Sequence, residues 1–268
     1  MKRGMMPQQS SEETVASSVY TRDYYEAHCD GYAEFQNARG SLLPERLQLP
    51  FQIAGLTPGM SALDVGCGRG EIVWHAARLG ARAVGFDYST SAIEIAAETT
   101  KSSPDAGAIL IHLGNAQRLP YRDGSFDRAF MLDVVEHLHP AELHRAFLEI
   151  RRSLRPGGRL IVHTMPNTWY YQVGYPIFRV VQRLRGKRLP ADPRDRWKYK
   201  EVHVNEQNLI RLRRALTAAG FKAKVWLQST HSYVEEPNRY IRWAMRALVT
   251  IYPFRWVFCD DIFAVAEK

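Results

Sequence analysis

Short apolar runs alternate with segments of helical spacing through the middle of the chain. The apolar runs predict strands at 61–65, 82–87, 108–113, 126–132 and 158–163. The segments between them predict helices at 70–79, 90–101 and 140–153. Strands that alternate with helices are typical of a parallel sheet covered on both faces. The pattern therefore predicts an α/β fold.

The flanking regions extend this pattern at both ends. Before the first strand, 20–38 favours one or two short helices, and 42–53 has apolar positions at helical spacing. After the fifth strand, 206–219 predicts a helix that Gly220 ends. The last two predicted strands are 221–228 and 257–266. Seven strands are therefore expected.

The chain of 268 residues is long enough for one large domain, and we assign 19–268 to it. The polar segment 1–18 lacks the apolar stretch of a secretory signal, and we expect a disordered tail. No apolar run approaches the roughly 20 residues that span a bilayer. The three cysteines have no metal-type spacing and suit a reducing compartment, so we expect a cytoplasmic protein.

A glycine-rich turn carries the clearest chemical signal. The strand at 61–65 contains Asp64, and Gly66, Gly68 and Gly70 follow at alternate positions before a helix. Glycines let a backbone turn sharply and let a ligand lie against it, and the helix offers unpaired N–H groups. The next strand ends in Asp87, whose carboxylate can accept both hydroxyls of a ribose. Glu71 at the helix start would repel a pyrophosphate but would tolerate a sulfonium and an ammonium group.

From these residues the sequence resembles the class I S-adenosylmethionine-dependent methyltransferases, including bacterial small-molecule and ubiquinone-pathway O-methyltransferases. Further matches are the segment 114–120 (GNAQRLP), the segment 132–138 (LDVVEHL) and the turn 154–160 (LRPGGRL). The resemblance implies a Rossmann-like, seven-stranded, mostly parallel sheet with helices on both faces and an inserted cap. The cofactor-binding core would be about 56–163, and the substrate cap would be the insertions at about 164–200 and 229–255.

The resemblance also implies S-adenosyl-L-methionine as cofactor and a set of residues that contact it. Asn115 and Ala116 would lie beside the adenine, and Arg46 would reach the methionyl carboxylate. Tyr24 or Tyr25 could lie over the sulfonium, although packing of the leading helices onto the sheet is the favoured interpretation for each tyrosine. The expected cofactor contacts are Arg46, Asp64, Gly66, Cys67, Gly68, Gly70, Asp87, Tyr88, Asn115, Ala116 and Asp133.

Three histidines are candidates for removing a proton from an acceptor hydroxyl, since histidine titrates near neutral pH. We expect His137 to be the foremost, His203 the next and His163 the third. Each also has a structural interpretation, as a residue of the turn, of a helix entry capped by Asn205, or of the core. Asp133, Glu136 and His137 could share one face and hold a divalent ion, but cofactor contact is favoured and no metal is assigned.

The net charge of +8 is concentrated between Arg179 and Arg214, which contain twelve Lys and Arg residues against four acids. This excess favours an anionic or membrane-anchored acceptor, a nucleic acid or an anionic membrane surface, and a solvated basic face without a partner explains it equally well. Ile177, Val180, Val181 and Leu184 form an apolar stripe at helical spacing. Such a helix either lies peripherally on a membrane or packs on the core with solvated arginines, and packing is commoner.

The leading hypothesis is methyl transfer to a small-molecule acceptor, most readily at oxygen of a sugar, lipid-linked, phenolic or quinone intermediate. A nucleic-acid methyltransferase is an alternative, but we see neither a separate RNA-binding module nor an Asn-Pro-Pro segment after the fourth strand. A non-catalytic cofactor-binding scaffold is the other alternative, and the intact glycine turn argues against it. The sequence leaves the acceptor and the oligomeric state open.

Overall fold

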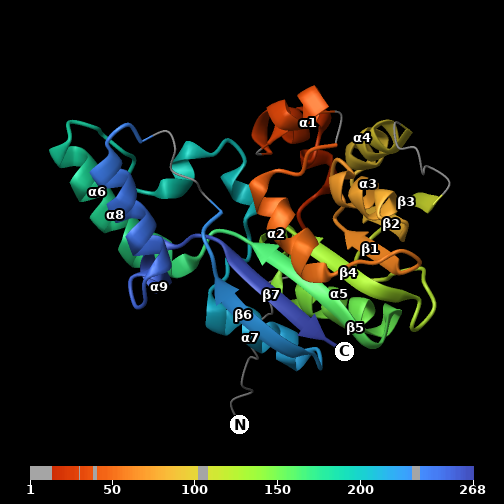
Figure 1. Cartoon of the computed structure of the whole chain (residues 1–268). Coiled ribbons are helices and arrows are strands. Elements are labelled where there is room, and N and C mark those ends of the chain that lie inside the picture. Colours follow the sequence, from red (N-terminus) through yellow and green to blue (C-terminus); the bar gives the residue numbers. More distant parts are fainter. Residues whose placement is uncertain (1–13, 30, 39–40, 102–107, 231–235) are drawn as a thin grey trace, which may run out of the picture.

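A seven-stranded mixed sheet is the centre of the computed structural model, which describes residues 14–29, 31–38, 41–101, 108–230 and 236–268 (Figure 1). The strands are β1 Ser61–Val65, β2 Arg82–Asp87, β3 Ile109–Leu113, β4 Phe126–Leu132, β5 Leu154–Thr164, β6 Lys222–Leu227 and β7 Ile262–Glu267. Their order is β3-β2-β1-β4-β5-β7-β6. Only β7 is antiparallel to its neighbours within the described sheet. The predicted fold class is confirmed.

Helices cover both faces of the sheet (Figure 1). On one face lie α2 Glu45–Ala54, α3 Glu71–Arg78 and α4 Thr90–Lys101, and on the other lie α5 Pro140–Ser153 and α7 Leu209–Ala218. The other helices are α1 Tyr32–Ala38, α6 Tyr175–Leu184, α8 Arg239–Thr250 and α9 Arg255–Phe258. Short helical turns lie at Ser17–Val19, Tyr24–His28, Val135–His137, Tyr170–Gly174, Pro193–Arg196 and Lys200–Val202.

The core divides between the two faces because successive side chains of a strand point in opposite directions. In β4, Ala129 and Met131 pack with the α5 side, whereas Phe130 and Leu132 pack with the α3 side. All five residues of β1 are buried. This continuous burial explains why the central strands appear in the sequence as unbroken apolar runs.

Local chemistry shifted several predicted boundaries. The helix α7 begins three residues later than predicted because the Asn208 side chain accepts the N–H groups of Ile210 and Arg211. The cap is therefore Asn208 and not Asn205, whose side chain donates to the Leu138 carbonyl. The strand β7 begins later than predicted because residues 255–258 form α9.

Residues 1–13 of the predicted tail lie outside the described residues, and residues 14–18 differ from the prediction. The Thr14 hydroxyl donates to the Glu142 carboxylate at 2.5 Å, and the Val15 carbonyl accepts from the Tyr88 hydroxyl at 3.4 Å. Val15 also packs against a buried cluster that contains Tyr20. The tail prediction is wrong for this part, since tertiary contacts hold a locally polar segment in place.

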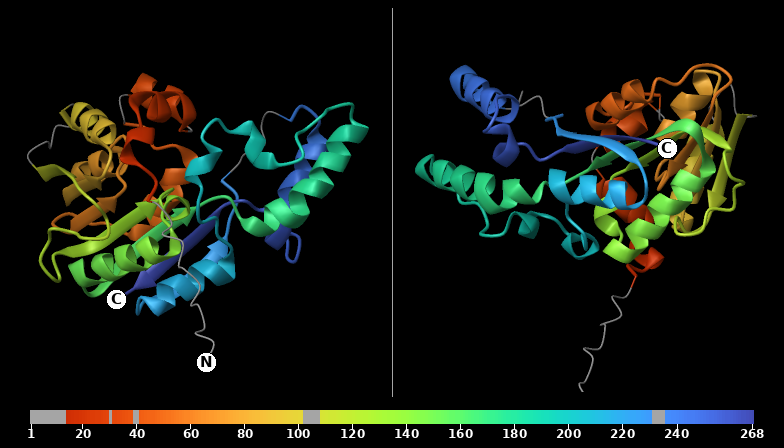
Figure 2. Two further views of the ribbon diagram at one scale, coloured as in Figure 1. Left: turned by 180° about the vertical axis from the view of Figure 1, so that it is seen from behind. Right: turned by 90° about the horizontal axis from the view of Figure 1, so that it is seen from below.

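The two insertions project from the core as one lobe, on the side away from α3, α4 and β3 (Figures 1 and 2). The lobe contains α6 from the first insertion and α8 and α9 from the second. The closest approach is at Gly174, where an added Cβ would lie 1.9 Å from the Val257 carbonyl oxygen. Among the described helices, none combines the length and the apolar character needed to cross a bilayer.

Candidate functional site

A cavity of about 420 Å³ lies beyond the carboxyl ends of β1, β2 and β4. Ligands of open α/β sheets bind at this edge. Of the fourteen predicted site residues, the structure places twelve in the wall of this one cavity. They are Arg46, Asp64, Gly66, Cys67, Gly68, Asp87, Tyr88, Asn115, Ala116, Asp133, His137 and His203. The remaining two, Gly70 and His163, have other positions that are described below.

The glycine turn forms one wall of the cavity. Gly66 has a φ of +79°, and a Cβ added there would lie 2.3 Å from Cγ2 of Val134. Only glycine fits this position, because both the backbone angle and the space exclude a side chain. Gly70 also has a positive φ, but its missing Cβ makes room for Ala96 of α4. Gly70 therefore serves the packing of α3 against α4 instead of the cavity wall.

Two buried carboxyl groups end the first two strands. Asp87 accepts the backbone N–H of Gly68 at 3.0 Å and of Ser89 at 2.9 Å. Burial raises the pKa of Asp87, and burial together with the charges of Asp87 and Glu71 raises the pKa of Asp64 to about 8. Carboxyl groups that lie close together in a low dielectric raise one another's pKa, so a cationic ligand would stabilise their ionised forms.

Two arginines near the cavity are engaged by acids of the protein. Arg69 and Glu71 form a buried ion pair, with Nη2 and Oε1 3.1 Å apart. The Glu71 charge is therefore balanced within the chain, which weakens its predicted role of repelling a pyrophosphate. Arg46 is bonded to the Asp133 carboxylate at the cavity wall. A carboxylate of a ligand would therefore contact Arg46 while Arg46 stays bonded to Asp133.

His163 connects two carboxylates beneath the cavity instead of lining it. Its Nδ1 lies 2.5 Å from Oδ1 of Asp133, and its Nε2 lies 3.2 Å from Oδ1 of Asp261. The ring is fully buried against Phe263. Asp133 has the left-handed φ of 56°, which the surrounding bonds must maintain. His163 is therefore placed as a positioning residue for Asp133, because burial keeps its ring from an acceptor.

The opposite wall is formed by the loop after β3. The Asn115 side-chain oxygen accepts the Gln117 N–H at 2.8 Å, and the backbone of Ala116 follows it along the cavity. This bond uses the amide oxygen and leaves the amide N–H₂ group to face a ligand. An Asn can thus occupy a position where Asp is frequent in the resembled family, because the oxygen serves the loop.

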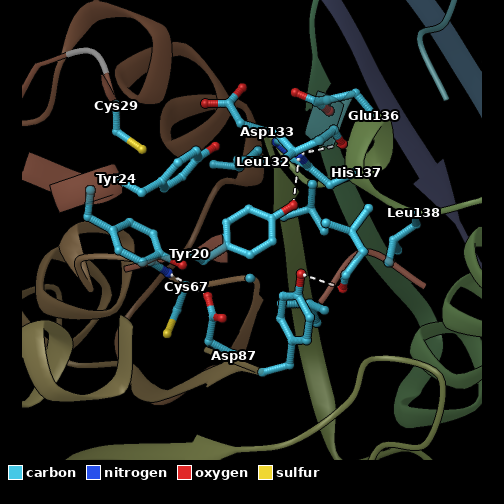
Figure 3. Close-up of a pocket in the computed structure, with 18 of the residues that line it drawn as sticks. Tyr20, Tyr24, Cys29, Cys67, Asp87, Leu132, Asp133, Glu136, His137 and Leu138 are labelled. Atoms are coloured by element: carbon cyan, nitrogen blue, oxygen red, sulfur yellow. Dashed lines mark hydrogen bonds between the residues drawn. The ribbon is translucent and has the colours of Figure 1, made fainter. Parts of the chain in front are cut away.

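Tyr20 was not predicted as a site residue. Figure 3 shows its ring inside the cavity, with the hydroxyl directed at His137 and Asp87 on the other side of the ring. The hydroxyl lies 3.1 Å from Nδ1 of His137, and the ring contacts Tyr24 and Tyr88 edge-on. Tyr20 begins an aromatic run whose spacing matches no single helix face, so only the fold reveals its position.

The far end of the cavity contains two histidines in edge-to-face contact and an acid. The rings of His137 and His203 have centroids 4.9 Å apart, and Trp197 contacts His203 at 5.0 Å. Burial lowers the pKa of His137 to about 3 and that of His203 to about 4, and it raises the pKa of Glu136 to about 7. Both imidazoles are therefore neutral at physiological pH, and the same burial makes them weaker bases than a solvated histidine.

Ligand-type atoms of Glu136, His137 and His203 lie within 4.8 Å of one another and could hold a divalent ion. This set differs from the predicted one. Asp133 is bonded to Arg46 and His163, and His203, which follows the first insertion in the chain, takes its place. Glu136 also accepts the Thr164 hydroxyl at 2.8 Å, which fixes its carboxylate without an ion.

The cavity fits an adenosyl cofactor with a cationic centre. The glycine turn exposes backbone, Asp87 ends β2, and the buried acids Asp64 and Asp87 favour positive charge. A methyltransferase-domain family model matches residues 63–162. These residues form a class I methyltransferase domain.

Relatives of the methyltransferase domain agree with this assignment. The methyltransferase GfsG of Streptomyces halstedii is 32% identical over 46% of this chain and 43% of its own length. A demethylmenaquinone methyltransferase of Symbiobacterium thermophilum is 36% identical over 39% of this chain and 42% of its own. The chain spans less than two thirds of the length of the first curated relatives it matches.

The fold of the whole described chain also has solved counterparts. A structure of an S-adenosylmethionine-dependent methyltransferase from Methanosarcina mazei superposes with a TM-score of 0.57. It covers 82% of this chain and 97% of the other, at 21% identity. At that identity the likeness establishes the fold alone.

Proposed function

We propose that this protein transfers a methyl group from S-adenosylmethionine to a small-molecule acceptor, at an oxygen atom. The observation that carries the proposal is the arrangement of the cavity. One end has the glycine turn with Asp64 and Asp87, and the other end has the neutral imidazoles of His137 and His203. A cationic methyl donor and a proton acceptor would thus face the same space.

The cofactor, when bound, supplies a methyl group that a sulfonium has already activated. Asp87 would accept the ribose hydroxyls, Asn115 and Ala116 would lie along the adenine, and Asp64 would face the ammonium group. Gly66, Cys67, Gly68 and Tyr88 would complete the contact surface. Asp133, held by His163, would fix the Arg46 guanidinium toward the methionyl carboxylate.

The imidazole of His137 would accept a hydrogen bond from the acceptor hydroxyl. Its low pKa means that it would take the proton only as methyl transfer makes that hydroxyl strongly acidic. Nδ1 of the ring lies 3.2 Å from the Val202 carbonyl oxygen, which can only accept, and 3.1 Å from the Tyr20 hydroxyl, which can accept or donate. A hydrogen on Nδ1 satisfies both contacts. The lone pair is then on Nε2, which can take the proton of an acceptor hydroxyl. His203 packs against this ring and would position the acceptor with Trp197.

The chemistry around the cavity favours an amphiphilic acceptor. Trp197 and Tyr199 offer apolar surface, while Arg196 adds positive charge to the same wall and Lys198 is paired with Asp23. This combination suits a lipid-linked, sugar-linked, phenolic or quinone intermediate that is anionic or held at a membrane. O-methyltransferases of Aspergillus sclerotiorum and Aspergillus nomiae are among the chain's relatives, at 36% and 35% identity, which supports transfer to oxygen.

The test is a methyl-transfer screen with labelled cofactor and host metabolite and lipid extracts, read by the mass shift of the product. His137→Ala is expected to slow turnover at least about a hundredfold, the usual value of a general base, with little change in cofactor affinity. His144→Ala, an exposed histidine on α5, is the matched control. Equal loss of turnover and affinity in His137→Ala would assign this residue a structural role. Methyl incorporation into RNA alone would favour the nucleic-acid alternative.

A further inference from the structure

We propose that the α6–α9 lobe, defined as residues 173–188 and 236–258, docks on an anionic lipid bilayer. The lobe presents exposed apolar side chains among arginines, and it lies next to the wall of the cavity. Proximity of a lipid acceptor rests on the proposed function, whereas the binding of the bilayer itself does not.

The helix α6 is oriented with its apolar stripe toward solvent. The buried positions are Tyr175 and Gln182, and the Gln182 side-chain oxygen has no hydrogen-bond partner in the described structure. The apolar stripe is exposed by 47 to 84%, and it consists of Ile177, Val180, Val181 and Leu184. Packing of this stripe on the core, the commoner of the two expected arrangements, is therefore wrong. A helix whose apolar stripe faces solvent leaves that stripe for a partner.

A second group of exposed apolar side chains comes from the other insertion. Tyr240 and Trp243 of α8 are exposed by 71 and 72%. Ile251, Tyr252, Phe254 and Trp256 follow around α9 at 48 to 54%. Tryptophan and tyrosine are the residues that favour the boundary between lipid chains and water, because their rings are apolar with one polar edge.

Positive charge surrounds both groups. The lobe contains nine Arg and Lys residues and a single acid, Glu236. Arg185 already binds Glu236, with Nη2 and Oε2 3.2 Å apart. An anionic lipid surface would complement this charge, at about 1 kcal/mol for each Lys or Arg near the surface.

The two insertions act as one body in this role. Arg185 at the end of α6 binds Glu236 before α8, and the missing side chain of Gly174 lets the first insertion contact Val257 of α9. Figure 2 shows α6 and α8 projecting from the same side of the core in both views. Both apolar groups are therefore held on a common support that the rest of the fold leaves uncovered.

Charge and composition favour lipid over the other occupants. A second copy of the lobe would bring nine cations against nine cations, which opposes self-association. A nucleic acid would pair with the arginines but would leave Leu184 and Val180 exposed to water. A bilayer satisfies both features, since lipid chains take the apolar side chains and head groups take the arginines.

The lobe contacts the cavity wall through Arg196, whose guanidinium lies 5.4 Å from the centroid of the Tyr175 ring of α6. Residues 196–199, together with Val202 and His203, follow α6 in the chain and line the cavity. Docking through α6 would therefore hold the acceptor end of the cavity close to the bilayer. An acceptor with a lipid tail could reach His137 without leaving the membrane completely.

The experiment measures cosedimentation of the full chain with vesicles of phosphatidylcholine alone and of phosphatidylcholine mixed equally with phosphatidylglycerol. The wild type should bind the anionic vesicles and not the neutral ones. The double variant Leu184→Glu with Trp243→Glu should lose at least about tenfold in affinity. The matched control, Leu148→Glu with Ile210→Glu, has the same charge change at exposed positions of α5 and α7 and should bind normally.

A second pair of variants tests the charge. Arg179→Gln and Arg183→Gln should each weaken binding about fivefold, with greater weakening as salt is lowered. Affinity for S-adenosylhomocysteine should stay unchanged in every lobe variant, so failure of lipid binding is separable from failure of the cofactor site. Absence of vesicle binding by the wild type, or equal binding by lobe and control variants, would overturn the proposal. A wild-type dimer that Leu184→Glu dissociates would instead assign the surface to a second copy, and heparin retention without vesicle binding would assign it to nucleic acid.

Discussion

The carboxylate of Asp87 provides the sharpest test of the cofactor site. It accepts two backbone N–H groups, from Gly68 at 3.0 Å and Ser89 at 2.9 Å, and it faces the cavity. Truncation to alanine would leave both N–H groups without this acceptor, at about 1–3 kcal/mol each. The isosteric Asp87→Asn is therefore the better perturbation, because its amide oxygen keeps one of the two bonds.

The magnitude follows from the bonds that change in Asp87→Asn. The substitution has two opposing effects on the free energy of unfolding. One charge-assisted hydrogen bond to Asp87 is lost, which destabilises the fold. The buried charge of Asp87, whose desolvation raises its pKa, is also removed, which stabilises the fold. We expect the free energy of unfolding to change by no more than about 2 kcal/mol. For binding, the ribose hydroxyls lose an ionised acceptor, worth about 1.5–3 kcal/mol, which is a loss of about ten- to 150-fold in affinity.

The assay is calorimetric titration with S-adenosylhomocysteine, alongside thermal unfolding to establish that the variant is folded. Asp123→Asn, which makes the same change at an exposed carboxylate bonded to Arg152, is the control and should bind as the wild type does. A folded Asp87→Asn protein whose dissociation constant lies within threefold of the wild type would refute the placement of the ribose at β2.

Three further predictions follow from the same geometry. The pKa of Asp64 is raised to about 8, so this carboxyl group is mostly protonated at pH 7. A cationic ligand favours the ionised carboxylate, so ligand binding should release a proton. The affinity for the ligand should therefore increase as pH rises toward 8. Calorimetry in buffers of different ionisation enthalpy measures the release, and an undiminished release in Asp64→Asn would contradict this assignment. Burial lowers the pKa of His137 to about 3, so its ring proton resonances should show no titration between pH 5 and 8, and a midpoint near 6.5 would disprove the buried placement. Gly174→Ala places a Cβ 1.9 Å from the Val257 carbonyl oxygen, and the overpacking should cost about 1–3 kcal/mol in thermal unfolding; Gly186→Ala, where the space is open although φ is +79°, should cost less.

The central strands and helices were predictable because their signals are local. The runs at 61–65, 82–87 and 126–132 coincide with β1, β2 and β4 residue for residue, since buried parallel strands need continuous apolar sequence. The glycine turn was also predictable from the sequence, because Gly66 requires a backbone angle that other residues avoid. The order of the strands and turns placed most of the cofactor-side residues at one edge of the sheet before the structure was known.

Only the tertiary structure determined the contacts between segments that are far apart in the chain. Residues separated by 30 to 117 positions are joined by the edge-to-face contact of His203 with His137, by the bond of Tyr20 to His137 and by the burial of His163 between Asp133 and Asp261. The apolar stripe of α6 likewise depends partly on local sequence and partly on tertiary structure. Periodicity identified its apolar face, but the direction of that face depends on what Tyr175 and Gln182 pack against. Local sequence determines which backbone forms and which side is apolar, whereas the free energy of packing distant segments determines which side is covered.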